Sequence, residues 1–259
     1  MAPIVINTQE EIAAMRRGGK ILADVLARVA AMVAPGADAA VLNTEAERII
    51  AAHGATPLFL GYQPEGAASP YPAALCVSIN DEVVHAIPYE GKVIRDGDVV
   101  SLDLGVRYEG MCVDSALTVA AGGVPARTQK LIAVTNKALY EGIAAVRAGA
   151  KLGDVGHAIQ LCVEREGFSV VRELAGHGVG HHAHEEPMIL NFGKKGTGEA
   201  LVAGMTIAIE PMVTAGDWRI KTDKDGWGIR TMDGSLAAHF EHTVLVTEEG
   251  CEILTGLEA

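Results

Sequence analysis

Four carboxylates interrupt segments that otherwise have the pattern of buried strands, and this feature constrains the fold more than any other. They are Asp103, Asp114, Glu210 and Glu241. A buried ionised carboxylate is costly unless it is paired or binds a cation. No lysine or arginine lies in these four segments. The chain must therefore fold so that something other than a neighbouring basic side chain compensates these charges.

The first two carboxylates are predicted to lie on neighbouring strands. In DVVSLDLGV (98–106) apolar residues alternate with Ser101, Asp103 and Gly105, so Asp103 lies on the more polar face of a strand. Taken alone, this pattern also fits a solvated aspartate. The residues RYEG (107–110) are suited to a turn, and a hairpin built on it pairs residue 103 with residue 114. Directly opposed carboxylates are destabilising unless one holds a proton or a cation lies between them, and a shared divalent cation is the simplest explanation.

Histidines are concentrated in HGVGHHAHEEP (177–187), which holds four of the nine in the chain. The stretch does not match the H-E-x-x-H motif of helical zinc peptidases, because Met188 stands where the second histidine would be. Gly178 and Gly180 disfavour a regular helix. We therefore predict a loop or strand end that brings His177 close to a site.

The predicted elements occur in a similar order in two halves of the chain. Thr8 and Glu11 form a capping-box pattern for a helix over 8–33, and Gly54 follows a second helix over about 40–53. The further elements are strands at 74–79, 97–106 and 112–120, helices at 126–147 and 153–166, and strands near 168–173, 204–214 and 239–247. The sequence thus predicts one α+β domain, residues 1–259, with related halves 1–122 and 123–259.

Composition excludes several classes of protein. Hydrophobic residues make up 49% of the chain, enough for a substantial core, and the net charge of −12 disfavours general binding to nucleic acids or anionic membranes. No apolar run approaches the roughly 20 residues needed to span a bilayer. The N-terminal residues MAPIVINTQEE lack the features of a secretory signal. We expect a cytoplasmic protein.

Five separated motifs resemble, in this order, those of the methionine aminopeptidases, and the resemblance covers essentially the whole chain. They are SINDEVVHAIP (78–88), SLDLGVRYEGMCVDSA (101–116), GHGVGHHAHEEP (176–187), IAIEPMV (207–213) and HFEHT (239–243). The chain is similar to the short type I form without an N-terminal extension. The resemblance implies the pseudo-two-fold "pita-bread" fold, an antiparallel sheet covered by helices. It also implies removal of the initiator methionine from peptides and nascent proteins with a small second residue.

The same resemblance implies a set of site residues. The metal ligands would be Asp103, Asp114, His177, Glu210 and Glu241, holding two divalent ions. An oxygen-rich set suits Mn²⁺, Co²⁺ or Fe²⁺, and zinc stays open. His85 would hydrogen-bond near the scissile amide nitrogen, His184 would polarise the scissile carbonyl, and Glu210 would also carry a proton to the leaving amine. His181 and His182 have no matched role.

An apolar pocket for the methionine side chain is also implied. Its residues would be Tyr62, Tyr71, Cys76 and Trp227, although simple core packing is the alternative for each. Two departures from the family pattern bear on this pocket. The link QPEGAASP (63–70) is longer than usual, and Ala183 stands where a bulky aromatic residue is common.

Two other functions stay open, both on the same fold. A proline-specific aminopeptidase usually carries a large extra N-terminal domain, and a non-catalytic binding protein typically lacks the metal ligands. As partners we expect peptides and nascent chains with N-terminal methionine, no membrane and no sequence-specific nucleic acid, and we expect a monomer. A transient contact with the ribosome through Arg219, Lys221 and Lys224 is a further hypothesis.

Overall fold

The structure is a computed structural model that describes residues 5–256. Part of the predicted 1–259 domain, and part of the N-terminal stretch interpreted above, therefore lies outside the described residues. Within the described range the helices are α1 (Gln9–Ala31), α2 (Ala39–Ala52), α3 (Ala126–Ala144) and α4 (Leu152–Arg165). None of these helices has the length and apolar character required to cross a membrane.

The ends of the first two helices follow the predicted local signals. The Thr8 hydroxyl accepts a hydrogen bond from the Glu11 backbone N–H, and the Glu11 carboxylate accepts one from the Thr8 N–H at 2.7 Å. This reciprocal capping box satisfies two N–H groups at the start of α1. The second helix ends before Gly54, whose φ of +68° lies in the left-handed region that favours glycine. Both predictions are confirmed.

The strands form one large sheet and two small ones. The strands are β1 (Thr56–Pro57), β2 (Leu75–Ile79), β3 (Glu82–Val84), β4 (Val99–Tyr108), β5 (Met111–Ala120), β6 (Ser169–Val170), β7 (Ala175–Gly178), β8 (Glu185–Leu190), β9 (Thr206–Ile209), β10 (Met212–Thr214), β11 (Ile220–Thr222), β12 (Ile229–Thr231), β13 (Ala237–His239), β14 (Glu241–Val246) and β15 (Cys251–Ile253). The nine-stranded sheet has the order β1-β4-β5-β14-β9-β7-β8, with β2 paired to β4 and β15 paired to β14. The two three-stranded sheets have the orders β13-β10-β6 and β11-β12-β3.

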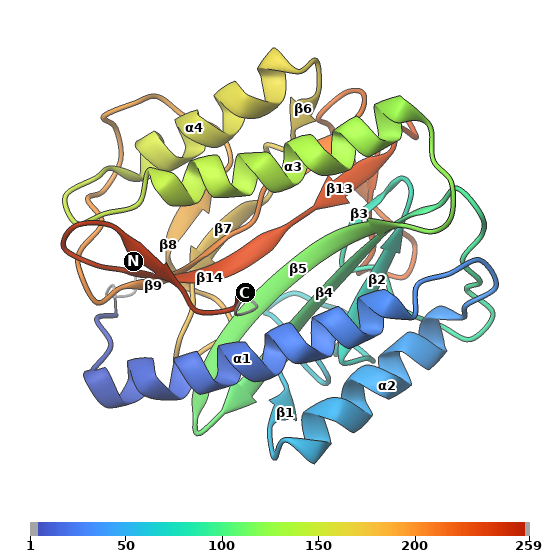
Figure 1. Ribbon diagram of the computed structural model, residues 1–259, viewed down its shortest axis with the longest axis horizontal. Coiled ribbons are helices and arrows are strands. Elements are labelled where there is room, and N and C mark those ends of the chain that lie inside the picture. The colour runs from blue at the N-terminus through green and yellow to red at the C-terminus, as the bar shows by residue number, and fades with distance from the viewer. Residues whose placement is uncertain (1–4, 257–259) are drawn as a thin grey trace.

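The four helices lie on one side of the large sheet, α1 over β4 and β5, α2 over β1 and β2, and α3 and α4 over the later strands (Figure 1). On β14, His242 points to the helices, since its ring packs against Tyr140 of α3 with centroids 5.9 Å apart. On β5, Val113 points to them, since a Cβ placed on Gly18 of α1 would lie 3.5 Å from it. Side chains alternate along a strand. The neighbouring residues on these two strands therefore face away from the helices.

The hairpin of β4 and β5 differs from the predicted register. Its turn has two residues, Glu109 and Gly110, both with positive φ (48° and 86°), which suits the twist of a tight hairpin better than a four-residue turn. Asp103 consequently lies opposite Ala116, and Asp114 lies opposite Gly105. The prediction that the carboxylates are directly opposed was wrong by two residues. A shift of two keeps them on one face, as diagonal neighbours.

Two predicted strands are each divided in the structure. The segment predicted at 204–214 forms β9 and β10, separated by Glu210 and Pro211, and proline cannot continue the ladder because it has no N–H. The segment predicted at 239–247 forms the end of β13 and then β14, separated by Phe240. In each case the first and second parts pair in different sheets. Glu210 therefore lies in a strand break and not within a strand as predicted.

Hydroxyl side chains connect β5 to β14 where the backbone ladder is short. Only Glu241–Ala116 and His242–Ser115 are paired in register. The Thr243 hydroxyl accepts from the Asp114 N–H at 2.9 Å and donates to the Asp114 carbonyl oxygen at 2.8 Å. The Ser115 hydroxyl donates to the Glu241 carbonyl oxygen at 2.7 Å. These bonds fix the two carboxylate-bearing strands relative to each other.

Candidate active site

Neighbouring strands of the large sheet each bring one predicted ligand to the face away from the helices. In the order of the sheet, Asp103 lies on β4, Asp114 on β5, Glu241 on β14, Glu210 directly after β9, and His177 on β7. All five line one cavity of about 250 Å³. His177 is near the end of a short strand, as expected from its flanking glycines. The sheet thus brings together residues that are up to 138 positions apart in the sequence, from 103 to 241.

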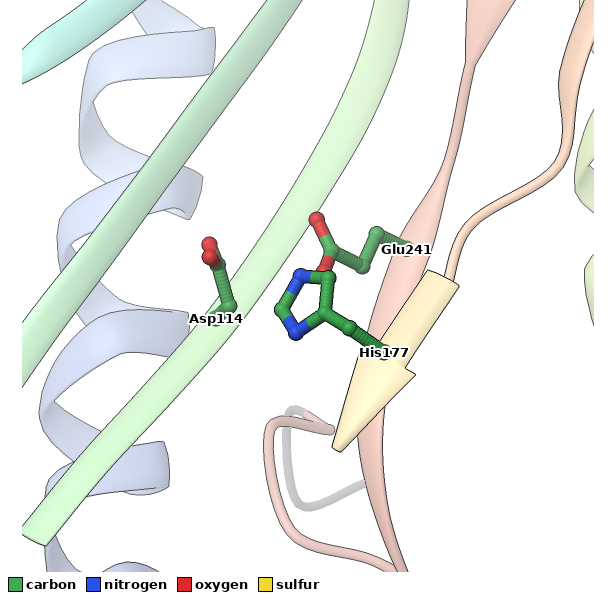
Figure 2. A group of neighbouring side chains, drawn as sticks. All are labelled: Asp114, His177 and Glu241. Carbon is green, nitrogen blue, oxygen red and sulfur yellow. The ribbon is translucent and has the colours of Figure 1, made fainter. Parts of the chain in front are cut away.

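Three of these side chains form a compact cluster. Potential ligand atoms of Asp114, His177 and Glu241 all lie within 4.8 Å of one another, and Figure 2 shows the three side chains turned toward a common point. Glu210 is adjacent, with its Oε1 3.4 Å from His177 Nε2. Asp103 is close enough that its charge raises the pKa of Asp114. The spacing is that of a site for small cations.

The four carboxylates are held in an environment that disfavours their charge. Burial raises the pKa of each, and it is the largest cause for all four. For Asp114, Glu210 and Glu241 the negative charges of neighbouring carboxylates raise the pKa further. The Glu241 Oε1 atom is buried without a hydrogen-bond partner. A divalent cation among them would compensate both the burial and the mutual repulsion.

The imidazole of His177 is oriented to accept such a cation. Its Nδ1 lies 2.9 Å from the Gly178 carbonyl oxygen, and because a carbonyl can only accept, Nδ1 carries the proton. Burial lowers the pKa of His177 to about 3, so the ring is neutral and its Nε2 lone pair is free. A histidine fixed in this way is typical of metal ligands. Four carboxylates and one neutral imidazole therefore fit divalent metal ions.

Two further histidines line the same cavity. The His184 ring lies 4.3 Å from the His177 ring between centroids, and its Nδ1 is 2.8 Å from the Tyr62 hydroxyl. Burial, with a smaller effect from His184, lowers the pKa of His85 to about 4. His85 also has a φ of +58°, unusual for a residue with a side chain. Neutral imidazoles at this position can donate or accept one hydrogen bond to a substrate amide.

One histidine at the site had no predicted role. His239 is 1% exposed, its Nε2 lies 3.7 Å from Glu210 Oε2, and neither ring nitrogen has a hydrogen-bond partner. The motif HFEHT contains it, but nothing in the local sequence distinguishes it from a core residue. Burial lowers its pKa to about 3. The ring is therefore a neutral polar group beside the Glu210 carboxylate.

The other end of the cavity is aromatic and apolar. The four predicted pocket residues all line it, together with Pro64 of the 63–70 link and with Phe59, which no sequence pattern had indicated. Tyr71 and Trp227 meet edge to face with centroids 5.2 Å apart. Burial raises the pKa of the Cys76 thiol well above its usual range, so the sulfur is uncharged. Ala183 packs in the same hydrophobic cluster as Phe59.

The size of the cavity limits what it can hold. Pockets for drug-sized molecules occupy about 300 to 1,000 Å³, and this one is smaller. It is suited to a single amino-acid side chain beside the ionisable cluster. A sulfur-containing chain packs well against aromatic edges.

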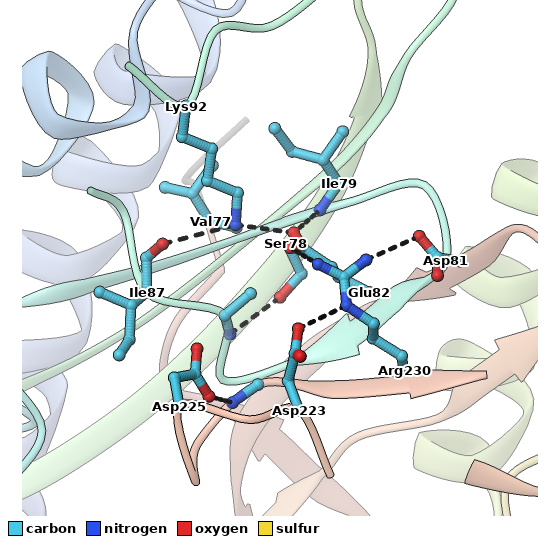
Figure 3. A network of polar contacts seen from close by, with 12 residues as sticks. Val77, Ser78, Ile79, Asp81, Glu82, Ile87, Lys92, Asp223, Asp225 and Arg230 are labelled. Atoms are coloured by element: carbon cyan, nitrogen blue, oxygen red, sulfur yellow. Dashed lines mark hydrogen bonds and ion pairs between the residues drawn. The ribbon is translucent and has the colours of Figure 1, made fainter. Parts of the chain in front are cut away.

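A polar network joins the two loops that carry His85 and Trp227 (Figure 3). Arg230 on β12 donates to Asp81 at 2.9 Å, to Glu82 on β3 at 2.7 Å and to Asp223 at 2.6 Å. His85 directly follows β3. Trp227 follows Asp223 in the β11–β12 turn. The guanidinium therefore holds both loops at a fixed separation.

The network continues into the core through a buried ion pair. Lys92 Nζ is 2.7 Å from Glu82, with the two side chains 7% and 8% exposed. The ammonium also donates to the Val77 carbonyl oxygen at 2.7 Å, next to Cys76 of the pocket. In the turn, Asp225 accepts from the Trp227 N–H at 2.8 Å. These contacts order the backbone on both sides of the aromatic pocket.

Replacing Arg230 with methionine is expected to raise KM for a methionyl peptide several-fold while kcat changes less than twofold, because the pocket loosens and the ligands do not move. Stability should fall by about 2 kcal/mol, since Glu82 loses one of its two cationic partners. Steady-state kinetics and urea unfolding measure both effects. Arg16→Met is the matched control, because Arg16 pairs with Glu252 at 2.7 Å outside the cavity. An unchanged KM with reduced stability would show that the network is only structural.

The remaining predicted residues lie outside the cavity. His181 is exposed and pairs with Glu11 of α1 at 2.8 Å, and His182 is exposed beside it. Arg219 pairs with Asp217 at 2.8 Å, while Lys221 and Lys224 are exposed on β11 and in the turn that follows. The histidine-rich stretch thus divides, with His177 and His184 at the site and the other two at the surface.

Comparison with known proteins identifies the family. Residues 13–248 match the model of metallopeptidase family M24, and the chain belongs to that family. It is 46% identical over 258 residues to a methionine aminopeptidase of Aquifex aeolicus, covering 98% of this chain and 99% of the relative. The crystal structure of methionine aminopeptidase from Thermotoga maritima superposes with a TM-score of 0.95 at 45% identity, covering 98% of this chain and 100% of that one.

Solved structures of lower identity share the fold. Prolidase from Pyrococcus furiosus matches with a TM-score of 0.76 at 21% identity, covering 98% of this chain but 66% of that chain. The predicted pita-bread architecture, with helices and an antiparallel sheet, is confirmed by these structures. The identity of 45% to the methionine aminopeptidase structure is about twice that to the prolidase, with which this chain shares the fold alone. Family membership and the buried ligand cluster together identify a divalent-metal-dependent peptidase.

Proposed function

We propose that this chain is a metalloaminopeptidase that removes N-terminal methionine from peptides and nascent proteins with a small second residue. One observation carries the proposal. A single cavity holds four carboxylates, three of them buried, and a neutral imidazole beside an aromatic pocket for one side chain. The relatives named methionine aminopeptidase, which match over nearly their whole length, favour this activity over the other activities of the fold.

The metal-binding residues in this proposal are Asp103, Asp114, His177, Glu210 and Glu241, which would hold two divalent ions. Four carboxylates balance the charge of two such ions, and an oxygen-rich set favours Mn²⁺, Co²⁺ or Fe²⁺, with zinc also compatible. Bound ions of this kind lower the pKa of water and polarise a carbonyl group.

The protein residues divide the remaining tasks. Tyr62, Tyr71, Cys76 and Trp227 bind the methionine side chain and exclude water from that end of the cavity. Glu210, which also faces His177 at 3.4 Å, carries the proton from the attacking water to the leaving amine.

Two neutral histidines complete this assignment. His184, oriented by the Tyr62 hydroxyl, donates a hydrogen bond to the scissile carbonyl oxygen as negative charge develops on it. His85 hydrogen-bonds near the scissile nitrogen. Both can act at neutral pH because burial keeps their pKa below the usual range of histidine.

A peptide panel tests the proposed specificity. Protein supplied with Mn²⁺ or Co²⁺ is expected to release methionine from Met-Ala-Ser and to leave Met-Lys-Ser and an Ala-Pro peptide largely uncut, because a cavity of about 250 Å³ leaves little room beyond the methionine side chain. Product release is followed by chromatography. Faster release of alanine from the Ala-Pro peptide would favour a proline-specific aminopeptidase. No release with any divalent ion would favour a binding protein.

The proposed substrate also indicates where in the cell the reaction takes place. Nascent chains present their N-termini at the ribosome, and we propose that the protein meets them as a monomer, with exposed Lys221 and Lys224 facing the ribosomal surface. Sedimentation of the protein alone and with ribosomes tests both points.

A further inference from the structure

A second groove continues from the active-site cavity along β7 and β8. It has a volume of about 560 Å³, and His177 and His184 line both spaces. The rest of its lining comes from residues 172–176 and from β8. The groove therefore begins at His177 and at His184, which under the proposed function donates to the scissile carbonyl oxygen.

The floor of this groove lies on the ligand-bearing face of the sheet. Ala175 pairs with Leu190 in the β7–β8 register, and alternation along each strand places His177 and Met188 on the same face as that pair. Met188 is 63% exposed and Leu190 is 38% exposed. Two large apolar side chains thus lie open to solvent in a channel that leads away from the reacting centre.

The walls of the groove carry an excess of carboxylates. Glu173, Glu185 and Glu186 line it, against a single cation, Arg172. That guanidinium is already engaged, since it lies 3.4 Å from Glu164 outside the groove and over the Trp218 ring at 5.3 Å. An apolar floor between acidic walls is complementary to apolar and basic side chains.

We propose that this groove binds the polypeptide chain that follows the second residue of the substrate, with apolar and basic side chains preferred. The inference rests on the proposed function. The active-site cavity, at about 250 Å³, accommodates about one residue, so the rest of a nascent chain must lie outside it. The groove shares two lining histidines with that cavity and extends over the same face of the sheet.

Peptides of different length test the proposal. Substrates are Met-Ala-Ser, Met-Ala-Ser-Leu-Lys-Leu and Met-Ala-Ser-Leu-Glu-Leu, with Mn²⁺ present. The lysine hexapeptide is expected to have a kcat/KM about fivefold above that of the tripeptide, mainly through KM, as burial of part of an apolar side chain would give. The glutamate hexapeptide should fall below the lysine hexapeptide, and high salt should reduce that difference.

A matched pair of variants locates the effect. Met188→Ser is expected to remove the advantage of the hexapeptides and to leave tripeptide cleavage within twofold. Met232→Ser replaces a methionine that is 59% exposed and does not line the groove, and it should change neither. Equal kcat/KM for the tripeptide and both hexapeptides in the unmodified protein would overturn the proposed role of the groove and leave the proposed function intact. An equal effect of the two variants would do the same. Failure to cleave the tripeptide would instead overturn the proposed function, and the groove with it.

Discussion

Replacing Glu241 with glutamine is expected to lower kcat/KM for Met-Ala-Ser by about a thousandfold or more. The amide keeps the shape of the side chain but removes one of the four negative charges that would hold the divalent ions in the proposed site. Loss of metal-dependent stabilisation worth about 4 kcal/mol in the transition state corresponds to a thousandfold change in rate. Steady-state kinetics at saturating Mn²⁺, with calorimetric titration of Mn²⁺ binding, measure the activity and its cause.

The same variant should not destabilise the metal-free protein. Glu241 Oε1 is buried without a partner, and burial together with the charges of neighbouring carboxylates raises the pKa of this group. Neutralising it removes a repulsion that opposes folding. We expect the Tm without metal at pH 8 to stay unchanged or to rise by a few degrees. The control is Glu249→Gln, at an exposed position just beyond the end of β14, which should affect neither property. Tight Mn²⁺ binding by Glu241→Gln with more than a tenth of the activity would contradict the assignment.

Chelation of divalent ions is expected to abolish activity, and re-addition of Mn²⁺ or Co²⁺ to restore it. Thermal stability should respond in the same experiment, because ions that bind the folded state stabilise it by about 2.7 kcal/mol at a hundredfold excess over Kd. For a chain of this size that corresponds to an increase in Tm of about 5 to 10 °C. Activity that survives exhaustive chelation would contradict a metal-dependent peptidase.

The size of this thermal shift should depend on pH. Burial raises the folded-state pKa of Asp103, Asp114, Glu210 and Glu241 above the unfolded values. Their protonated forms therefore favour the folded state. Their stabilising contribution is complete below an unfolded pKa of about 4 and is lost as pH rises through the folded pKa values.

Divalent ions offset that loss, so the increase in Tm with Mn²⁺ should be larger at pH 8 than at pH 6. Differential scanning fluorimetry across this range, with and without chelator, gives the comparison. Asp114→Asn removes one of the titrating groups and should flatten the dependence. A metal-induced increase in Tm that is the same at every pH would mean that the buried carboxyl groups do not bind the ions.

Sequence patterns predicted the features that depend on neighbouring residues. The capping box at Thr8 and the alternation around Asp103 are both set by side chains a few positions apart, and both are observed. The register of the hairpin was missed because a two-residue turn with positive φ at Glu109 is not distinguished from a longer turn by residue type alone.

Features set by distant contacts had weaker signals. The pairing of β14 between β5 and β9 places Glu241 beside Asp114, and no local pattern encodes it. The resemblance of the motifs to those of a known family predicted instead that Glu241 and Asp114 belong to one site. His239 and Phe59 reach the site only through this long-range assembly, and each has the local sequence of an ordinary core residue. Residue type and spacing therefore located helices α1 to α4 and strands β2, β4 and β5, but not most of the short strands or the neighbours across the large sheet.

The hydroxyl bonds between β5 and β14 have a consequence for how variants of this protein are interpreted. Ser115 and Thr243 never touch the cavity, yet their hydroxyl groups fix how far apart two anionic side chains are held. A conservative exchange such as threonine to valine preserves the volume of the side chain and deletes the atom that sets this spacing. A survey of variants that considers only residues lining the cavity would classify such changes as silent. We expect them nevertheless to change the distance between the carboxylates of Asp114 and Glu241.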